Sequence, residues 1–427
     1  MSIRERLLEE SESSIFANKD LVRSETIIDA DRIVGRDKQL DRVAKNLRPA
    51  LREKGLTNML LSGPSGTGKS LMINAVCNQV ADLCESKGIR FGNLRLNCES
   101  PKSLDRAVYR LVKNSADNAG TDIGVPEKGV STDRKFDRLF EIVDTHYDVV
   151  VFVLDEIDQL QGPYDDKAHS SLLYQLSRVK KIHDIDTSVS VVGVTNDTNF
   201  VGEMGTRANS SFNPDDIFFD DYDADQLRAI LRKREDAFRE GVLDPEVIPL
   251  IAAFSSQTHG DARKAIDLFR WAGEIAERNN DSVVTEPHAR KAQEAYDQNR
   301  TLRHISGLAP QKKIALYATA TVECYSPSTT ELIPAGAGWE VYKYITQTIN
   351  VETYSRETYV NYVSEQETYG ILEAERRGRG RGNGVQMFFI LDEDPSDIIG
   401  TIEANSRLGA SQFSESVLRG IITANLD

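Results

Sequence analysis

The stretch "NMLLSGPSGTGKSLM", residues 58–72, decides the fold. It contains the pattern G-x-x-x-x-G-K-S, whose fixed positions are Gly63, Gly68, Lys69 and Ser70. An apolar, strand-like run precedes the glycines and a helix-like run follows them, which is the context of a phosphate-binding loop. Glycines let backbone N–H groups face phosphates, and the following helix adds its positive N-terminal end. The alternative interpretation is a glycine-rich turn without a ligand.

The chemistry of this loop predicts ATP or ADP with Mg²⁺ as its ligands. Lys69 can neutralise charge on the β- and γ-phosphates, and the Ser70 hydroxyl can ligate Mg²⁺. The residues predicted to contact the nucleotide are consecutive: Gly63, Pro64, Ser65, Gly66, Thr67, Gly68, Lys69, Ser70 and Leu71.

Polar side chains end two other strand-like runs. "DVVVFVLDE", residues 148–156, ends in Asp155 and Glu156, and "SVSVVGVTN", residues 188–196, ends in Asn196. Ligands bind at the carboxyl edge of a parallel sheet, so Asp155 is predicted to hold Mg²⁺. Glu156 is placed to orient and deprotonate the attacking water, and Asn196 to detect the γ-phosphate. The alternatives are a solvated acidic strand end and an ordinary turn asparagine.

Strand-like and helix-like runs alternate over the first half of the chain. The runs rich in Val, Ile and Leu cover residues 58–63, 90–98, 148–156, 188–196 and 216–222. Apolar residues at helical spacing fill the segments between them. Strands that are apolar on both faces and separated by helices predict an α/β fold with a parallel sheet covered on both sides.

Composition changes divide the chain further. Residues 1–25 are polar and aperiodic, and we expect a mobile arm there. The nucleotide-binding domain is predicted over 26–222, a helical domain over 223–302 and a third domain over 303–427.

Arg263 lies near the start of a predicted helix of the helical domain, just after Gly260. From there it could reach the γ-phosphate and couple the state of the nucleotide to domain closure. An exposed salt-bridge residue is the equally simple interpretation.

The third domain contains "LEAERRGRGRGNGVQMFFIL", residues 372–391. Helix-like segments precede it, one of them with Ser355 as its expected N-cap, and two strand-like runs flank the glycines. This order predicts a winged helix, whose wing can enter a minor groove or grip phosphates. The predicted DNA contacts are Arg356, in the last of these helices, and the wing arginines Arg376, Arg377, Arg379 and Arg381. A solvated Arg-Gly loop is the alternative.

The charge of the whole chain restricts its partners. It has 67 Asp and Glu against 52 Lys and Arg, a formal net charge of −15. A like-charged surface repels a polyanion, so indiscriminate nucleic-acid binding is disfavoured while one basic loop still gives a positioned contact. No apolar run approaches the roughly 18 residues of a membrane span. The four cysteines have no C-x-x-C spacing, which argues against a zinc site.

Several motifs together resemble AAA+ ATPases. They are most similar to the archaeal replication initiators related to eukaryotic origin-recognition and cell-division-control proteins. The stretches that carry the resemblance are "IVGRDKQLDRVAKNL", "GPSGTGKS", "VPEKGVSTDRKF", "VVFVLDEIDQL", "VVGVTND", "FDDYDADQLRAILRKR" and "HGDARKAIDL". They occur in the family's order over about residues 27–300.

This resemblance implies further sites and partners. Val34, Gly35 and Arg36 would lie along the adenine pocket, and Tyr222 and Arg234 would close over the nucleotide as part of a helical lid. The family also implies double-stranded origin DNA and the MCM replicative helicase as partners. It further implies a monomer in solution or several copies on DNA, in the cytoplasm with the nucleoid.

One departure from the family pattern concerns hydrolysis. AAA+ rings use an arginine from the neighbouring subunit, and Ser211 stands where that arginine would fall, with Arg207 four residues earlier. Since such an arginine contributes roughly 10³–10⁵ in rate, we expect slow turnover that acts as a switch.

Three functions remain open at this point. The first is an ATP-dependent initiator that binds origin repeats and helps to load MCM in its ATP state. The second is a DNA-binding regulator that holds ADP and hydrolyses little or no ATP. The third, a hexameric remodelling motor, is disfavoured by the missing arginine.

Overall fold

The computed structural model describes residues 15–24, 26, 32–53, 55–101, 103–161, 167–257, 260–326, 332–378, 385–410 and 413–426. The chain divides into two compact units, Met1–Ala292 and Gln293–Asp427. Each unit has its own hydrophobic core, and the two are described separately.

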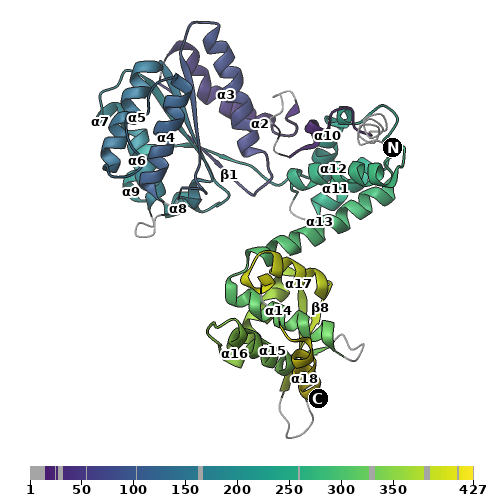
Figure 1. Cartoon of the computed structure of the whole chain (residues 1–427). Helices are drawn as coiled ribbons and strands as arrows, with labels where there is room; N and C mark the ends of the chain where they lie inside the picture. The colour runs from purple at the N-terminus through teal and green to yellow at the C-terminus, as the bar shows by residue number, and fades with distance from the viewer. Residues whose placement is uncertain are drawn as a thin grey trace, which may run out of the picture. The chain divides into compact units, whose positions relative to one another are not determined.

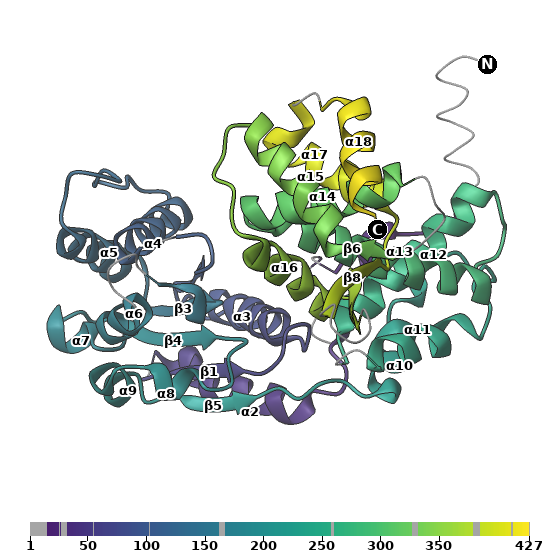
Figure 2. The ribbon, with the colours of Figure 1, turned by 90° about the horizontal axis from the view of Figure 1, so that it is seen from below.

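The first unit is built on a five-stranded parallel sheet with the order β2-β3-β4-β1-β5. Figure 2 shows strands β3, β4, β1 and β5 side by side. The strands are β1 (Met59–Ser62), β2 (Phe91–Asn97), β3 (Val149–Asp155), β4 (Ser188–Val194) and β5 (Asp215–Phe218). Every strand-like run of the sequence corresponds to one of them, so the α/β prediction is confirmed.

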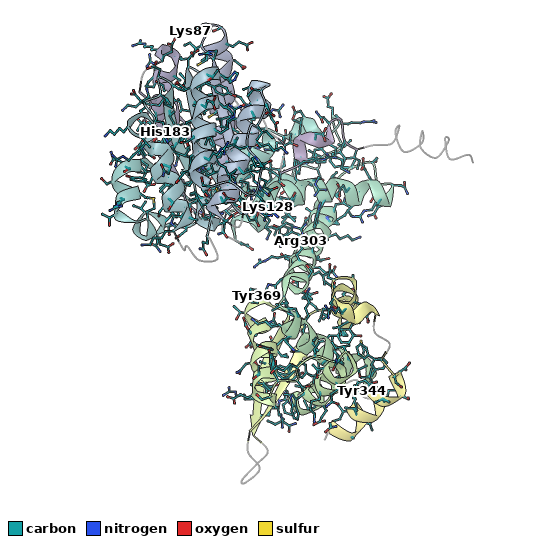
Figure 3. The ribbon with its side chains drawn as sticks, turned by 60° about the vertical axis from the view of Figure 1, so that its left-hand side comes forward. Lys87, Lys128, His183, Arg303, Tyr344 and Tyr369 are labelled. Atoms are coloured by element: carbon teal, nitrogen blue, oxygen red, sulfur yellow. The ribbon has the colours of Figure 1, made fainter. Side chains whose placement is uncertain are left out.

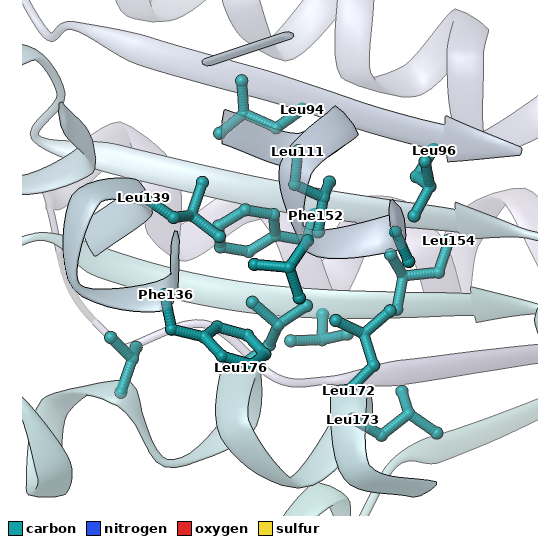
Figure 4. Packing of buried hydrophobic residues seen from close by; sticks show 14 of the residues in the cluster. Leu94, Leu96, Leu111, Phe136, Leu139, Phe152, Leu154, Leu172, Leu173 and Leu176 are labelled. Carbon is teal, nitrogen blue, oxygen red and sulfur yellow. The ribbon is translucent and has the colours of Figure 1, made fainter. Parts of the chain in front are cut away.

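Helices cover both faces of this sheet, because successive side chains of a buried strand point to opposite faces. Phe152 and Leu154 of β3 pack under α4, α5 and α6 (Figure 4), whereas Val151 and Val153 face α2 and α3. The helices and 3-10 turns are α2 (Asp37–Leu47), η3 (Arg48–Arg52), α3 (Lys69–Glu85), α4 (Leu104–Ala119), α5 (Thr132–His146), η4 (Ile157–Gln159), α6 (Ala168–Ser177), α7 (Val179–Ile182), α8 (Phe200–Glu203) and α9 (Thr206–Phe212).

A helical lid completes the first unit (Figure 1). Asp223 and Gln226 form a reciprocal capping box that starts its first helix, and Asp261 caps the third. The lid contains α10 (Ala224–Arg232), η5 (Glu235–Ala237), α11 (Val247–Ser256), α12 (Ala262–Asn279) and α13 (Glu286–Gly307), the last of which ends in the second unit.

The sequence predicts a mobile arm over residues 1–25, but the described residues 15–24 are ordered by contacts. They contain the short helix η1 (Lys19–Val22) and pack against the lid. Ile15, Phe16 and Val22 are buried there. Isolated apolar residues in a polar segment gave no periodic signal, so the sequence did not reveal that they have a partner surface more than 200 residues away.

The second unit is a winged helix, as predicted. Its three-stranded sheet has the order β6-β8-β7, and β7 and β8 form an antiparallel hairpin. Its elements are α14 (Pro310–Tyr325), β6 (Ile333–Pro334), α15 (Ala335–Thr348), α16 (Arg356–Ser364), η6 (Glu365–Tyr369), β7 (Leu372–Gly378), β8 (Val385–Leu391), α17 (Pro395–Ala404), η7 (Arg407–Ala410) and α18 (Glu415–Asn425). Within the described ranges of the chain, no helix is long and apolar enough to cross a membrane.

Close packing fixes α16 on the other helices of this unit. Tyr359 is fully buried, and its hydroxyl lies 2.6 Å from the Thr319 hydroxyl of α14. Gly338 of α15 leaves the space that the Tyr359 hydroxyl fills. Ser355 caps α16 by accepting a hydrogen bond from the Thr358 N–H, which confirms its predicted role. After α16, Tyr369 (Figure 3) stacks on His304 with ring centroids 3.7 Å apart.

Candidate nucleotide site and nucleic-acid interface

The glycine-rich loop connects β1 to α3 as its sequence predicts. Gly63 and Gly66 have φ angles of 134° and 76°, in a region that side chains disfavour. A Cβ at Gly63 would overlap the Phe219 carbonyl, and one at Gly66 would overlap the Asp261 carboxylate. Glycine is therefore required at both positions for conformation and for space.

Lys69 is held at the centre of this loop. Its ammonium donates to the carbonyls of Gly63 and Pro64, at 2.6 Å each, and to Asn196 Oδ1 at 3.0 Å. Burial lowers the pKa of Lys69 to about 8, with Arg263 as the second cause. Because an anion beside an ammonium favours its charged form, a phosphate bound here would raise that pKa again.

Ser70 and Asp155 supply oxygen atoms at one point of the site. The Ser70 hydroxyl donates to Asp155 Oδ1 at 2.9 Å, although the two residues are 85 positions apart. Mg²⁺ prefers oxygen ligands and is usually bound by one or two protein groups with phosphates and waters. The pair therefore fits the predicted magnesium site.

Glu156 directly follows β3 and lines the same cavity. Its backbone is left-handed, with a φ of 53°, which is uncommon for a residue with a side chain and places it in the turn directly after β3. Burial raises the pKa of Glu156, and the nearby Glu99 and Asp155 act in the same direction. A raised pKa suits a carboxylate that must accept a proton.

The end of β4 is fixed next to β3. Thr195 donates its hydroxyl proton to Asp158 at 2.6 Å and accepts from the Asp197 N–H at 3.0 Å. These bonds hold Asn196 between them, where its side-chain oxygen accepts from Lys69. Lys69 and the Asn196 side chain are thus in contact, and both line one cavity with Asp155 and Glu156, as the sequence predicts.

The lid touches the loop directly. The Ala262 N–H, in the first turn of α12, donates to the Gly66 carbonyl at 3.2 Å, and Arg263 beside it lines the cavity. Arg234 also lines the cavity, and its guanidinium donates to the Leu21 carbonyl at 2.5 Å. Burial lowers the pKa of Arg234 to about 10. Two arginines of the lid therefore line the same cavity as the phosphate-binding loop.

These groups surround a cavity of about 230 Å³. Most of the predicted nucleotide and catalytic residues line it: Ser65, Gly66, Thr67, Gly68, Lys69, Ser70, Leu71, Asp155, Glu156, Asn196, Arg234 and Arg263. Six others lie outside its lining: Val34, Gly35, Arg36, Gly63, Pro64 and Tyr222. The carbonyls of Gly63 and Pro64 instead hold Lys69.

Arg36 and Tyr222 lie behind the loop and contact each other. The Arg36 guanidinium lies 3.8 Å from the centre of the Tyr222 ring and donates to the carbonyls of Thr67 and Asp220. Both side chains are buried. In this arrangement they join the loop to the segment that leads into the lid, and direct contact of either with adenine stays a prediction.

The wing of the second unit carries the predicted basic contacts. Arg376 and Arg377 are exposed near the end of β7, where Arg377 pairs with Glu375 at 2.7 Å. Arg379 and Arg381 lie outside the described residues. Adjacent strand positions point to opposite faces, so Arg376 and Arg377 present their charges on both sides of the hairpin.

Helix α16 offers a different surface. Arg356, its first residue, is exposed, but so are Glu357 and, just after the helix, Glu365 and Glu367. Acidic side chains repel phosphates, so this surface suits DNA less well than the wing arginines do, and DNA contact by either stays a prediction.

Comparison with known proteins identifies the family. An ORC1-type DNA replication protein 5 of Halobacterium salinarum is 48% identical over 422 residues, which cover 98% of this chain and 99% of that protein. The chain belongs to the ORC1-type DNA replication proteins. Another ORC1-type DNA replication protein, number 14 of Haloarcula marismortui, is 47% identical and covers 97% of both chains.

Family models match three segments of this ORC1-type chain. Residues 32–192 match the AAA ATPase domain, residues 228–294 the Cdc6 AAA+ ATPase-type lid domain, and residues 303–401 the CDC6 C-terminal winged helix domain. The structure of the Aeropyrum pernix ORC1 protein in complex with DNA is 30% identical, with a TM-score of 0.73, and the match covers 93% of this chain and 98% of that one. The resemblance found in the sequence is confirmed.

Ser211 stands at the position where the family pattern would place a trans-acting arginine. In this ORC1-type protein Ser211 lies in α9, and Arg207 of the same helix is exposed. The two residues are four positions apart, so they lie on neighbouring turns of one helix.

Sequence reasoning missed several residues of the cavity, among them Asn97, Ser24 and Thr26. Asn97 ends β2 and pairs in register with Asp155, so the strand-end rule that identified Asp155 could have found it. Ser24 and Thr26 carried no signal in the sequence, because their place depends on packing against the distant lid.

Proposed function

We propose that this protein is an ATP-dependent initiator of chromosomal or plasmid DNA replication. It binds origin repeats in double-stranded DNA and, in its ATP state, helps to load the MCM helicase. The observation that carries the proposal is the combination, in one chain, of a cavity lined by most of the predicted nucleotide residues, with its lid, and a winged helix with a basic hairpin. The DNA complex of the related Aeropyrum pernix ORC1 protein supports the same conclusion.

The cavity supplies what ATP binding and hydrolysis require. Lys69 and the N-terminal end of α3 face the phosphates, and Arg263 and Asn196 can contact the γ-phosphate. Ser70 and Asp155 would hold Mg²⁺, which neutralises phosphate charge when bound. Glu156 orients and deprotonates the attacking water.

Slow hydrolysis makes this cycle a switch. Hydrolysis removes the γ-phosphate that Arg263 contacts, and Arg263 stands in the first turn of the lid helix that touches Gly66. The lid therefore binds the ATP and ADP states differently, which is the requirement for a ligand-controlled change of conformation. Ser211 in place of a trans-acting arginine keeps turnover low.

On DNA, Arg376, Arg377, Arg379 and Arg381 of the wing enter a minor groove or grip phosphates, and Arg356 contacts DNA from α16. We expect a monomer in solution and several copies on an origin, in the cytoplasm and associated with the nucleoid.

A helicase-loading assay on origin DNA tests this proposal. With ATP, the wild-type protein should retain MCM on origin-containing duplex, and with ADP it should retain little. Glu156→Gln is the matched variant, since it should keep ATP bound and MCM retained. Equal MCM retention with ATP, with ADP and without nucleotide would contradict the proposal.

The second candidate function is an ADP-holding DNA-binding regulator, which Ser211 favours. Single-turnover hydrolysis of bound radiolabelled ATP separates the two. Release of phosphate that depends on Glu156 supports the switch, and ATP that stays intact on both the wild type and Glu156→Gln supports the regulator.

A further inference from the structure

The described residues 15–24 and 26 form a segment that we call the N-terminal strap, which lies along the lid (Figure 1). Phe16 pairs with Phe238 in an antiparallel bridge. The N–H groups of Ala17 and Asn18 donate to the Ala237 carbonyl, at 2.8 and 3.0 Å, and the Arg239 N–H donates to the Ile15 carbonyl at 3.0 Å. The strap is thus bound to the lid by backbone hydrogen bonds.

Aromatic packing anchors the same segment. The Phe16 ring lies 4.8 Å from the Phe238 ring, which in turn lies 4.5 Å from Phe269 of α12. A Cβ at Gly273, also in α12, would meet the tip of the Phe16 ring, so the glycine provides the space for it. Lys19 adds an ion pair with Glu274 at 3.0 Å. Phe16 therefore occupies a formed pocket on the lid, and burial of its ring holds the strap in place.

From this anchor the strap continues to the nucleotide cavity. Its Leu21 carbonyl accepts from Arg234, and a turn closed by the Thr26 N–H and the Arg23 carbonyl follows. The turn places Ser24 and Thr26 in the lining of the cavity, together with Ile266 of α12. These side chains are uncharged. The charged residues of the lining are Lys69, Asp155, Glu156, Arg234 and Arg263.

The sugar and base of a nucleotide carry hydrogen-bonding groups and a flat apolar surface but no charge. Hydroxyl and apolar side chains therefore suit them as contacts. We propose that Ser24 and Thr26 contact the ribose or base of the bound adenine nucleotide, and that the Phe16 anchor couples release of the nucleotide to movement of the strap. This inference rests on the proposed nucleotide binding and adds to it the residues that form its base side.

The first test compares two ligands in the full-length protein by titration calorimetry. ADP contains sugar and base, whereas tripolyphosphate contains neither. The double variant Ser24→Ala, Thr26→Ala should bind ADP about 10-fold more weakly, the effect of removing two neutral hydrogen bonds, and tripolyphosphate as tightly as the wild type does. Ser86→Ala is the matched control, because Ser86 is exposed at the far end of α3. Unchanged ADP affinity, or equal weakening for both ligands, would overturn the proposal.

The second test measures release of radiolabelled ADP during a chase with unlabelled ADP. Phe16→Ala removes the anchor and should speed release at least about 10-fold, whereas Phe16→Leu retains much of the buried area and should have a smaller effect. Equal release rates in the wild type and both variants would overturn the coupling of release to the strap. Circular dichroism at the assay temperature verifies that each variant is folded.

Lys69→Ala distinguishes a failure of this inference from a failure of the proposed function. If ADP and tripolyphosphate bind the wild type and both lose affinity in Lys69→Ala, the nucleotide site stands, and the results for Ser24 and Thr26 decide the inference alone. If Lys69→Ala binds both ligands normally, the nucleotide site lies elsewhere and both proposals fall.

Discussion

Lys69 should make nucleotide binding depend on pH. Its pKa of about 8 in the free protein means that the ammonium loses its proton just above neutral pH. Bound phosphates favour the charged form, so above about pH 8 binding must take up a proton, and ADP affinity should fall by up to tenfold per pH unit. Below that pH Lys69 is already charged, and the dependence should disappear.

Calorimetry of ADP binding in two buffers of different ionisation enthalpy measures this proton uptake directly. We expect uptake to approach one proton at about pH 9 and to vanish at about pH 6.5. In Lys69→Arg the cation cannot lose its proton, so the variant should show no uptake. Constant ADP affinity and no uptake in the wild type would show that Lys69 does not face the phosphates.

Glu156 should control hydrolysis and leave binding intact. Glu156→Gln keeps the size and most hydrogen-bonding capacity of the side chain but removes the base, which typically contributes about 10²–10⁴ in rate. We expect ATP to remain bound and unhydrolysed, as measured by single-turnover phosphate release with a parallel binding titration. Normal turnover would place the base elsewhere.

At the scale of helices, Gly338 sets how closely α15 approaches α16. Gly338→Ala would push a Cβ into the Tyr359 hydroxyl, and we expect it to destabilise the second unit by about 1–3 kcal/mol. Gly400→Ala is the matched control: Gly400 lies in α17 with open space around it, so alanine should stabilise by about 0.5–1 kcal/mol. Denaturant unfolding followed by Trp339 fluorescence in a Trp271→Phe background measures both. Equal effects of the two substitutions would contradict the packing.

Elements with a local signal were predictable from the sequence. The loop from Gly63 to Ser70 is formed by its own glycines and the helix it opens, so its sequence pattern was enough to predict it, and the hairpin around Arg376 was equally local. Distant contacts were not predictable. The two-residue strand β6 depends on its pairing with β8, and the strap depends on its contacts with the distant lid, where Gly273 leaves room for Phe16.

The same reason explains which site residues the sequence could assign. Asp155, Glu156 and Asn196 follow buried strands, and the edge of a parallel sheet brings such positions together. Arg36 and Tyr222 came only from the family resemblance, and their stacking behind the loop is a tertiary contact between segments 186 positions apart. A sequence pattern does not indicate which side of the loop such a pair occupies.

Over the whole molecule, charge distribution determines how DNA is bound. A net charge of −15 opposes contact with a polyanion, so affinity must come from local basic groups such as the wing. Salt screens attraction and repulsion alike. The logarithm of the DNA-binding constant falls linearly with the logarithm of the salt concentration, and removing one arginine that binds a phosphate should make this slope shallower by about 0.9. Replacing the four wing arginines with alanine should therefore make the slope shallower by up to about 3.6, as measured by binding titrations across a salt series.

We propose that this one chain couples its nucleotide state to recognition of origin DNA. Fluorescence anisotropy with origin and scrambled duplexes, in ATP and in ADP, measures this coupling. The variants are alanine at Arg376, Arg377, Arg379 and Arg381, and a charge-matched variant with lysine at all four. We predict a preference for origin DNA that changes with nucleotide, is lost in the alanine variant and is partly retained in the lysine variant. Weak binding that is independent of DNA sequence and nucleotide and persists in the alanine variant would contradict a nucleotide-controlled origin binder.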